Sequence, residues 1–280
     1  MMFVAVGISN LVIGLAYVGL GLLSAWEAIS LHRYRGWSRF GLGFSMMAAS
    51  CGPHHLVHGW HVLQGGDVSV AMLTATLIGL PAGLIFVLLR LEAMRGGQGE
   101  RLIGASAQQM ALLASALTVV AGVLATSALA QPAADFSFET LCESAGPTSR
   151  DFVSRPEIKF LSAGFFANMF VTITYGMVGW YLAHQQVRRF VVAGDWSLSG
   201  TALVGVFFTC AQMHLVDATS SGSQVMLFFD LVGVPASVYF LWVVRQLHKD
   251  SVTDWNRRPL VGVAGAPARP SPWVGRSTQH

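Results

Sequence analysis

Residues 3–31 have the sequence FVAVGISNLVIGLAYVGLGLLSAWEAISL, in which Glu27 is the only charged side chain. An α-helix rises about 1.5 Å per residue, so about 20 apolar residues are enough to cross the hydrocarbon core of a bilayer. The run starts close to Met1 with no basic residue before it, which favours a retained span over a cleaved signal peptide. The stretch therefore predicts a helix embedded in a membrane.

The composition of the whole chain agrees with this stretch. Of the 280 residues, 53% are hydrophobic and 11% are charged, and the mean hydropathy is +0.55, whereas soluble domains carry about 25% charged residues. So few polar side chains exclude a soluble enzyme and a disordered chain.

The net charge is +3, but the Lys and Arg side chains lie at the ends of apolar runs, where they orient helices. We therefore expect no nucleic-acid binding. Three cysteines are too few for a disulfide scaffold.

Seven apolar runs follow one another along the chain and predict an all-α membrane protein with seven transmembrane helices. The predicted spans are 3–31, 40–64, 68–91, 103–131, 160–184, 197–219 and 223–246. The loop 132–159 is the only sizeable segment predicted outside, and its Cys142 is expected to be a bystander. The tail 250–280 is polar, without apolar periodicity, and is predicted to be disordered.

The positive charges predict the orientation of these spans. With the N-terminus outside, only Arg150, Arg155 and Lys159 of the 17 Lys and Arg residues lie outside the membrane. Cytoplasmic segments are enriched in Lys and Arg. We therefore expect an integral protein of a bacterial inner membrane, in contact with the lipid bilayer, with its N-terminus outside and its C-terminus in the cytoplasm.

The first three and the last three spans contain matching stretches in the same order. The pairs are NLVIGLAY (10–17) with NMFVTITY (168–175), CGPHHLVH (51–58) with CAQMHLVD (210–217), and IGLPA (78–82) with VGVPA (232–236). Three matches at a nearly constant offset indicate an internal repeat. Because three spans plus one linking span return the chain to the same orientation, the two copies are predicted to be parallel repeats about an axis normal to the membrane.

This repeat divides the chain into four predicted parts. Residues 1–96 form a first three-helix unit, and residues 97–159 form a linking helix and the outer loop. Residues 160–249 form a second three-helix unit, and residues 250–280 form the cytoplasmic tail. One chain would then resemble a dimer of three-helix units.

The matched stretches of spans two and six concentrate metal-ligating side chains. On a helix with 100° per residue, one face of span two within an arc of roughly 120° carries Cys51, His54, His55, His58 and His61. The same face of span six carries Cys210, Met213, His214 and Asp217. Ionisable groups inside a span usually face a functional interior. Thiolate, thioether and imidazole ligands suit Cu(I), and zinc second, so we predict that these residues form a metal site near the outer face.

Four further polar residues are predicted to support the bundle or the site. Asp230 in span seven is either an outer partner of the site or a packing residue, and Glu27 is expected near Arg33 at the inner interface. Asn10 and Asn168 occur at matching depth, where they either join helices by hydrogen bonds or hold the site from behind.

A family resemblance rests on the first unit. The stretch CGPHHLVHGW (51–60), preceded by Phe40-Gly41, resembles the second transmembrane helix of the ethylene-receptor sensor domain, which carries Cys-Gly-x-x-His-Leu followed by Trp. GLAY (14–17) and the basic turn from Arg33 to Arg39 are similar to the first helix and loop of that domain. The resemblance covers about residues 8–93 and, more loosely, residues 165–246.

The resemblance implies a copper site and a ligand. By it, Cys51 and His55 hold Cu(I), which in turn binds a small olefin, and Cys210 and His214 are their counterparts in the second copy. The family domain works as a dimer.

The residues themselves leave other functions open. The extra histidines and carboxylates also fit a membrane copper monooxygenase or oxidase, and paired histidines fit a b-type haem protein that transfers electrons. Parallel repeats with intramembrane acids occur in transporters as well, and a membrane protein partner is possible for each of these functions.

Overall fold

The computed structural model describes residues 2–66, 68–104, 106–107, 109, 162–218 and 224–249. In these residues six helices and a two-stranded ribbon follow one another. They are α1 (Met2–Arg35), α2 (Arg39–Leu63), α3 (Val70–Met94), β1 (Leu102–Gly104), α6 (Ala163–Ala193), β2 (Asp195–Ser197), α7 (Leu198–Ala218) and α8 (Gln224–Lys249). The six helices coincide with six of the seven predicted spans. Most of the predicted span 103–131, the outer loop with Cys142 and the tail 250–280 lie outside the described residues.

Four of the six described helices are long and apolar enough to cross a membrane. They are Phe3–Tyr34, Val70–Met94, Leu198–Ala218 and Val225–His248. The chain is therefore a helical membrane protein. α2 and α6 are of comparable length, but α2 buries three histidines and α6 carries glutamine and arginine pairs near its end, so both are more polar.

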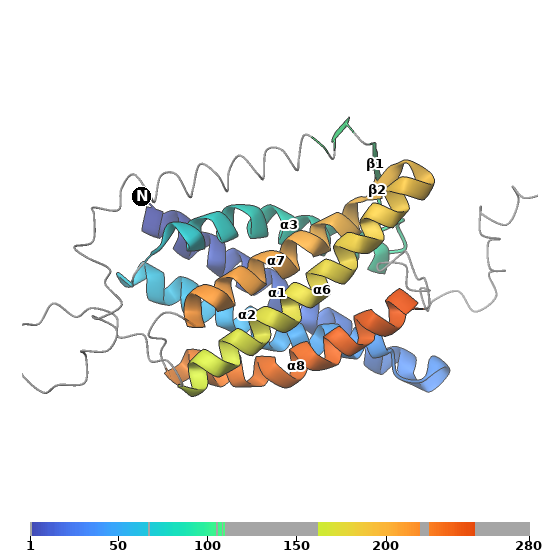
Figure 1. The fold of residues 1–280 in the computed structure, drawn as a ribbon. Helices are drawn as coiled ribbons and strands as arrows, with labels where there is room; N and C mark the ends of the chain where they lie inside the picture. The colour runs from blue at the N-terminus through green and yellow to red at the C-terminus, as the bar shows by residue number, and fades with distance from the viewer. Residues whose placement is uncertain are drawn as a thin grey trace, which may run out of the picture.

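The helices run along one another in a single elongated bundle (Figure 1). α1 packs most extensively against α2, and α6 packs against both α7 and α8. Two further contacts join the first three helices to the last three, namely α3 with α7 and α2 with α8. α2 and α7 consequently face each other across the interior, which brings their polar faces together.

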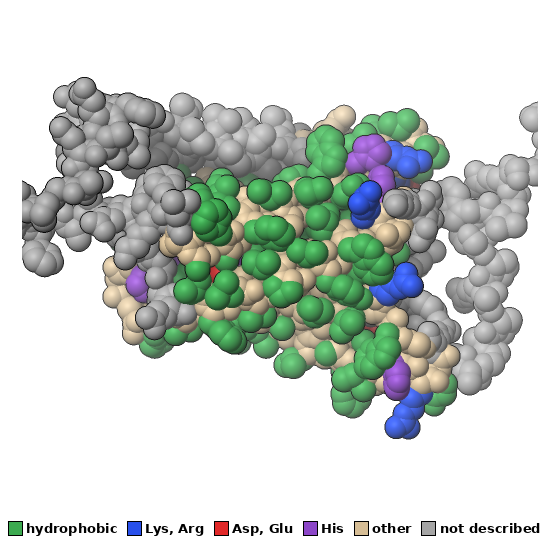
Figure 2. All heavy atoms as spheres, turned by 60° about the horizontal axis from the view of Figure 1, so that its bottom comes forward, with side chains coloured by type: hydrophobic (Ala, Val, Ile, Leu, Met, Phe, Trp, Pro, Cys, Tyr) green, Lys and Arg blue, Asp and Glu red, His purple; other side chains and the backbone are tan. Residues whose placement is uncertain are grey.

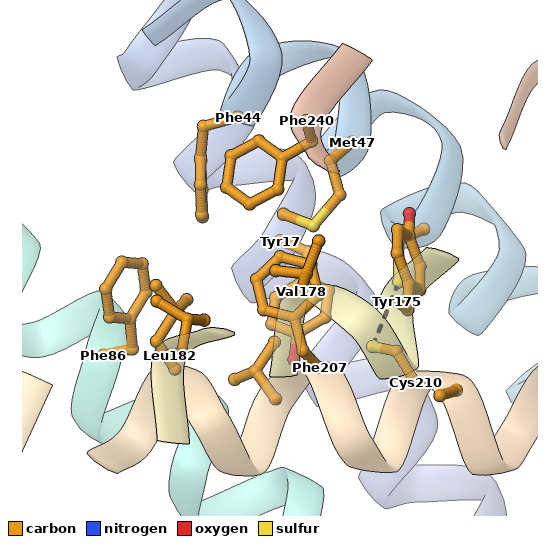
Figure 3. Packing of buried hydrophobic residues seen from close by; sticks show 14 of the residues in the cluster. Tyr17, Phe44, Met47, Phe86, Tyr175, Val178, Leu182, Phe207, Cys210 and Phe240 are labelled. Carbon is orange, nitrogen blue, oxygen red and sulfur yellow. Dashed lines mark hydrogen bonds between the residues drawn. The ribbon is translucent and has the colours of Figure 1, made fainter. Parts of the chain in front are cut away.

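The centre of the bundle is filled by aromatic and aliphatic side chains. Tyr17, Phe44, Phe207 and Phe240 are among its buried members, and the rings of Phe207 and Phe240 stack with 5.2 Å between centroids. Figure 3 shows this packing, with Tyr175 and Cys210 at one side of the cluster. The site described below thus borders a closely packed apolar core, which excludes water from it.

The surface of the bundle matches a lipid environment. Large apolar side chains point outward along the helices, and Trp26, for example, is 72% exposed. Figure 2 shows a broad apolar surface on the visible face, with Lys and Arg side chains gathered towards one end of the bundle. Such a distribution is expected where lipid tails surround the middle of a protein.

The basic end of the bundle contains two contacts that the sequence did not predict. β1 pairs with β2 in antiparallel fashion, with Ile103 opposite Trp196, so residues 102–104 form a strand and not the start of the predicted span 103–131. Glu27 forms a largely buried ion pair with Arg90 of α3, whereas the sequence suggested proximity to Arg33. Because α1 and α3 run side by side, Arg90 lies opposite Glu27 at this depth.

Candidate metal centre

Two cysteines from different halves of the chain meet at the centre of the site. Cys51 lies midway along α2 and Cys210 lies in the second half of α7, and their Sγ atoms are 3.5 Å apart. Both thiols are buried and free, and a disulfide bond would need a distance of about 2.05 Å. The two sulfur atoms therefore face the same point in the interior.

His55 adds a nitrogen to this sulfur pair. It follows Cys51 by one helical turn, and its Nε2 lies 4.0 Å from the Sγ of Cys210. Cys51, His55 and Cys210 are all buried, and each offers a ligand atom that lies within 4.8 Å of the other two. We name these three residues the sulfur group.

Asn10 of α1 determines which nitrogen of His55 is available. The Nδ2 of Asn10 donates to the carbonyl of Val6 at 2.9 Å and to the hydroxyl of Thr76 at 3.4 Å. Its Oδ1 therefore accepts the hydrogen bond of 2.7 Å from Nδ1 of His55. With the proton on Nδ1, Nε2 carries a lone pair on the side of the sulfur atoms, as a metal ligand requires.

A second group of polar residues lies beside the first. His54 donates from Nε2 to Oδ2 of Asp217 at 2.9 Å, and its Nδ1 lies 2.9 Å from Oδ1 of Asp230. His214 approaches the same cluster, with 4.8 Å between the ring centroids of His54 and His214. His54, His214 and Asp230 each offer a ligand atom within 4.8 Å of the other two. We name these three residues the His–Asp group.

Asn168 of α6 holds the His–Asp group from behind. Its Nδ2 donates to the carbonyl of Gly164 at 3.1 Å and to Oδ2 of Asp230 at 2.7 Å. Its Oδ1 therefore accepts the hydrogen bond of 2.6 Å from Nδ1 of His214, which leaves the lone pair of His214 on Nε2. Asn168 thus orients one carboxylate and one imidazole at once.

The two histidine–asparagine pairs have matching surroundings. The ring of Tyr17 meets His55 edge-on at 5.7 Å, and the ring of Tyr175 meets His214 edge-on at 5.8 Å. Thr76 contacts Asn10 at the position where Asp230 contacts Asn168. The two environments differ mainly in this exchange of a hydroxyl for a carboxylate.

The remaining predicted ligands lie farther from both groups. His58 is buried, and its Nδ1 lies 4.0 Å from Oδ1 of Asp217. His61 is exposed at the end of α2. Met213 packs in a small apolar cluster with Val6 and Val62, and it also lines the cavity beside His55.

Asp230 is the one group member that the sequence placed only as an outer partner or a packing residue. It lies on α8, which the predicted site did not include, and it reaches His54 because α8 packs against α2. Its position in an apolar helix was the signal, since an acid at such a depth is costly unless it has partners.

A small cavity adjoins the sulfur group. Its lining includes Ile13, Tyr17, His55, Thr76 and Met213. Apart from His55 and the hydroxyl groups of the lining, its walls are mostly apolar, and it has room for about one water-sized molecule.

The protein is thus a helical membrane protein. Its bundle brings together two buried sets of side chains that could hold a metal ion. The chain matches no protein-family model, no curated protein and no solved structure.

Proposed function

We propose that the protein is an integral membrane copper-binding protein whose sulfur group holds Cu(I). The observation that carries the proposal is the convergence of two free thiols at 3.5 Å with His55 beside them in a buried position. Two sulfur ligands on one ion at about 2.3 Å each, at a tetrahedral angle, would lie about 3.8 Å apart. The observed separation is close to this value, so the residues fit a shared metal ion.

The type of donors favours Cu(I) first and zinc second. The sulfur group offers two thiolates and one imidazole, and soft sulfur ligands suit Cu(I). A b-type haem is less well supported, because the rings of His54 and His214 are in near contact at 4.8 Å and leave no space for a macrocycle between them.

The bundle supports two parallel three-helix units as the source of this site. In a twofold arrangement, a residue that touches its own equivalent lies on the axis. Cys51 and Cys210 are equivalent residues of the two matching stretches, and they touch. The proposed copper therefore lies on the axis between the units and is shared by them, which predicts one copper per chain.

The proposed site lies in the half of the bundle remote from the basic end. His55 is in the second half of α2, and Asn10 and Asn168 are near the starts of α1 and α6. With Lys and Arg on the cytoplasmic side, the site would be nearer the outer face, with the N-terminus outside. Copper would bind a small apolar ligand there, and the resemblance of residues 51–60 to the ethylene-receptor sensor domain supports this role.

Copper retention by variants tests the proposal. We expect Cys51→Ala and His55→Ala each to abolish copper retention by the full-length protein, because each removes one of three ligands. The protein is purified in detergent under reducing conditions, so that both thiols stay free, and copper is measured by elemental analysis. Cys142→Ala is the control, and it should retain copper as the wild type does. Equal copper content in all three variants would rule out the sulfur group as the site.

A further inference from the structure

The His–Asp group has contacts that the proposed copper site does not explain. Its side chains are at least nine-tenths buried, and the side chains of His54 and Asp230 are 2% and 4% exposed. An ionisable side chain at this depth is costly unless its polar atoms have partners. The partners of each atom therefore indicate what the group is built to hold.

Two atoms of the group face each other without a hydrogen bond. Nε2 of His54 donates to Asp217, so in the neutral ring the lone pair is on Nδ1. That nitrogen lies 2.9 Å from Oδ1 of Asp230, whose other oxygen accepts from Asn168. Neither Nδ1 of His54 nor Oδ1 of Asp230 has a hydrogen-bond partner among the described residues. With a neutral His54, two atoms with lone pairs thus converge in a buried position.

A bound cation accounts for this convergence. Nitrogen and oxygen ligands of one Zn²⁺ ion lie about 2.0–2.2 Å from it, which puts them about 3 Å from each other. A doubly protonated His54 that forms an ion pair with Asp230 across the same 2.9 Å is the alternative, and the metal-binding experiment below separates the two.

The ligand types indicate the class of cation. Two imidazole rings and one carboxylate suit Zn²⁺ and its neighbours Fe²⁺ and Co²⁺, whereas Mg²⁺ and Ca²⁺ prefer oxygen ligands. The His–Asp group contains no sulfur, which separates it in chemistry from the sulfur group. The adjacent rings of His54 and His55 are nearly perpendicular, with centroids 6.2 Å apart, so they serve different points.

We propose that His54, His214 and Asp230 form a second metal site, which binds a divalent first-row cation of the zinc type. This site goes beyond the proposed copper function and does not depend on it. Asn168 positions two of the three ligands by its hydrogen bonds to His214 and Asp230. Asp217 fixes the ring of His54 by accepting from its other nitrogen.

Zinc and cobalt binding by the full-length protein tests this site. We expect purified wild-type protein loaded with Zn²⁺ to retain one zinc per chain in addition to any copper. Loss of a residue that only orients a metal ligand lowers metal affinity about 10- to 100-fold. Asp230→Asn removes a ligand itself and should lower zinc affinity by more than that. The matched control is Asp195→Asn, which removes an acid that pairs with Arg189 far from the group, and it should bind zinc as the wild type does.

The wild-type protein gives a second readout that needs no variant. Co²⁺ bound by nitrogen and oxygen ligands should show visible d–d bands without the near-ultraviolet band of thiolate-to-cobalt charge transfer. Absence of zinc and cobalt binding, a thiolate band, or equal loss of zinc in Asp230→Asn and Asp195→Asn would overturn the second site. Copper is measured in the same samples with Cys51→Ala as a cross-control, so a failure of the copper proposal is distinguishable from a failure of this one.

Discussion

At the scale of single residues, two asparagines decide what the histidines can do. The NH2 group of each amide donates hydrogen bonds to nearby oxygen atoms. The amide oxygen therefore accepts a hydrogen bond from Nδ1 of a histidine. That choice leaves the lone pair of each ring on Nε2. The ligands of both proposed sites therefore depend on side chains that do not contact the metal themselves.

A reciprocal pair of variants tests this role of the asparagines. Asn10→Ala should lower copper affinity about 10- to 100-fold and leave zinc affinity unchanged, because it frees only the ring of His55. Asn168→Ala should do the reverse, because it frees His214 and Asp230. Competition with chelators of known affinity measures both. Equal effects of the two variants on both metals would indicate that the asparagines only support the fold.

The sequence predicted most of the polar residues of the site but not their grouping. Residues of α2 and α7 were predicted from helical periodicity, which places them on one face of each helix. Periodicity does not give the rotation of one helix against another. His54 and His55 are neighbours in the sequence and yet join different groups, and Asp230 joins from a third helix.

At the scale of elements, α1 and α2 approach closely through glycines. A Cβ atom added to Gly59 would lie 2.7 Å from the carbonyl oxygen of Gly7 and 3.0 Å from the backbone nitrogen of Leu11. Small residues allow such backbone contact between membrane helices. Because Asn10 is also in contact there, this approach holds the amide that orients His55.

Gly59→Ala should therefore destabilise the protein by about 1–3 kcal/mol, since the added methyl group forces two backbones apart. Copper affinity should fall as well, because Asn10 moves with α1. Unfolding by denaturant in detergent measures the first effect, and chelator competition measures the second. Gly176→Ala in α6 is the control, since no atom lies within 4 Å of a Cβ added at Gly176. Equal stability of the two variants would contradict the close approach.

The largely buried ion pair of Glu27 and Arg90 links α1 to α3 at the basic end. Removing one member of a buried ion pair typically costs about 3–5 kcal/mol. We therefore expect Arg90→Met to destabilise strongly, and the double variant with Glu27→Gln to recover part of the loss. Denaturant unfolding of the two single variants and the double variant measures the coupling. Additive effects would show that the pair contributes little.

The elements themselves were the most predictable part of the fold. Long apolar runs set the helix positions, and the six described helices coincide with predicted spans to within a few residues, except at the C-terminal end of α6. The β1–β2 ribbon was not predicted, because three-residue strands have no periodic signal. The pairing of Glu27 was missed because it depends on how α1 lies against α3.

At the scale of the whole molecule, one chain with two three-helix units would do the work of a dimer. The two units would meet at Cys51 and Cys210, and on either side of this contact the two copies would have diverged. Where the first unit has Thr76, the second has Asp230, and this exchange would provide the charge for a divalent cation. Duplication within one chain would thus allow two chemically different sites to lie side by side.

X-ray absorption spectroscopy of copper-loaded wild-type protein tests whether the sulfur group holds Cu(I). We expect one Cu(I) per chain, with two sulfur ligands and one nitrogen ligand. Copper bound without sulfur ligands, or a protein that retains no copper under reducing conditions, would contradict it.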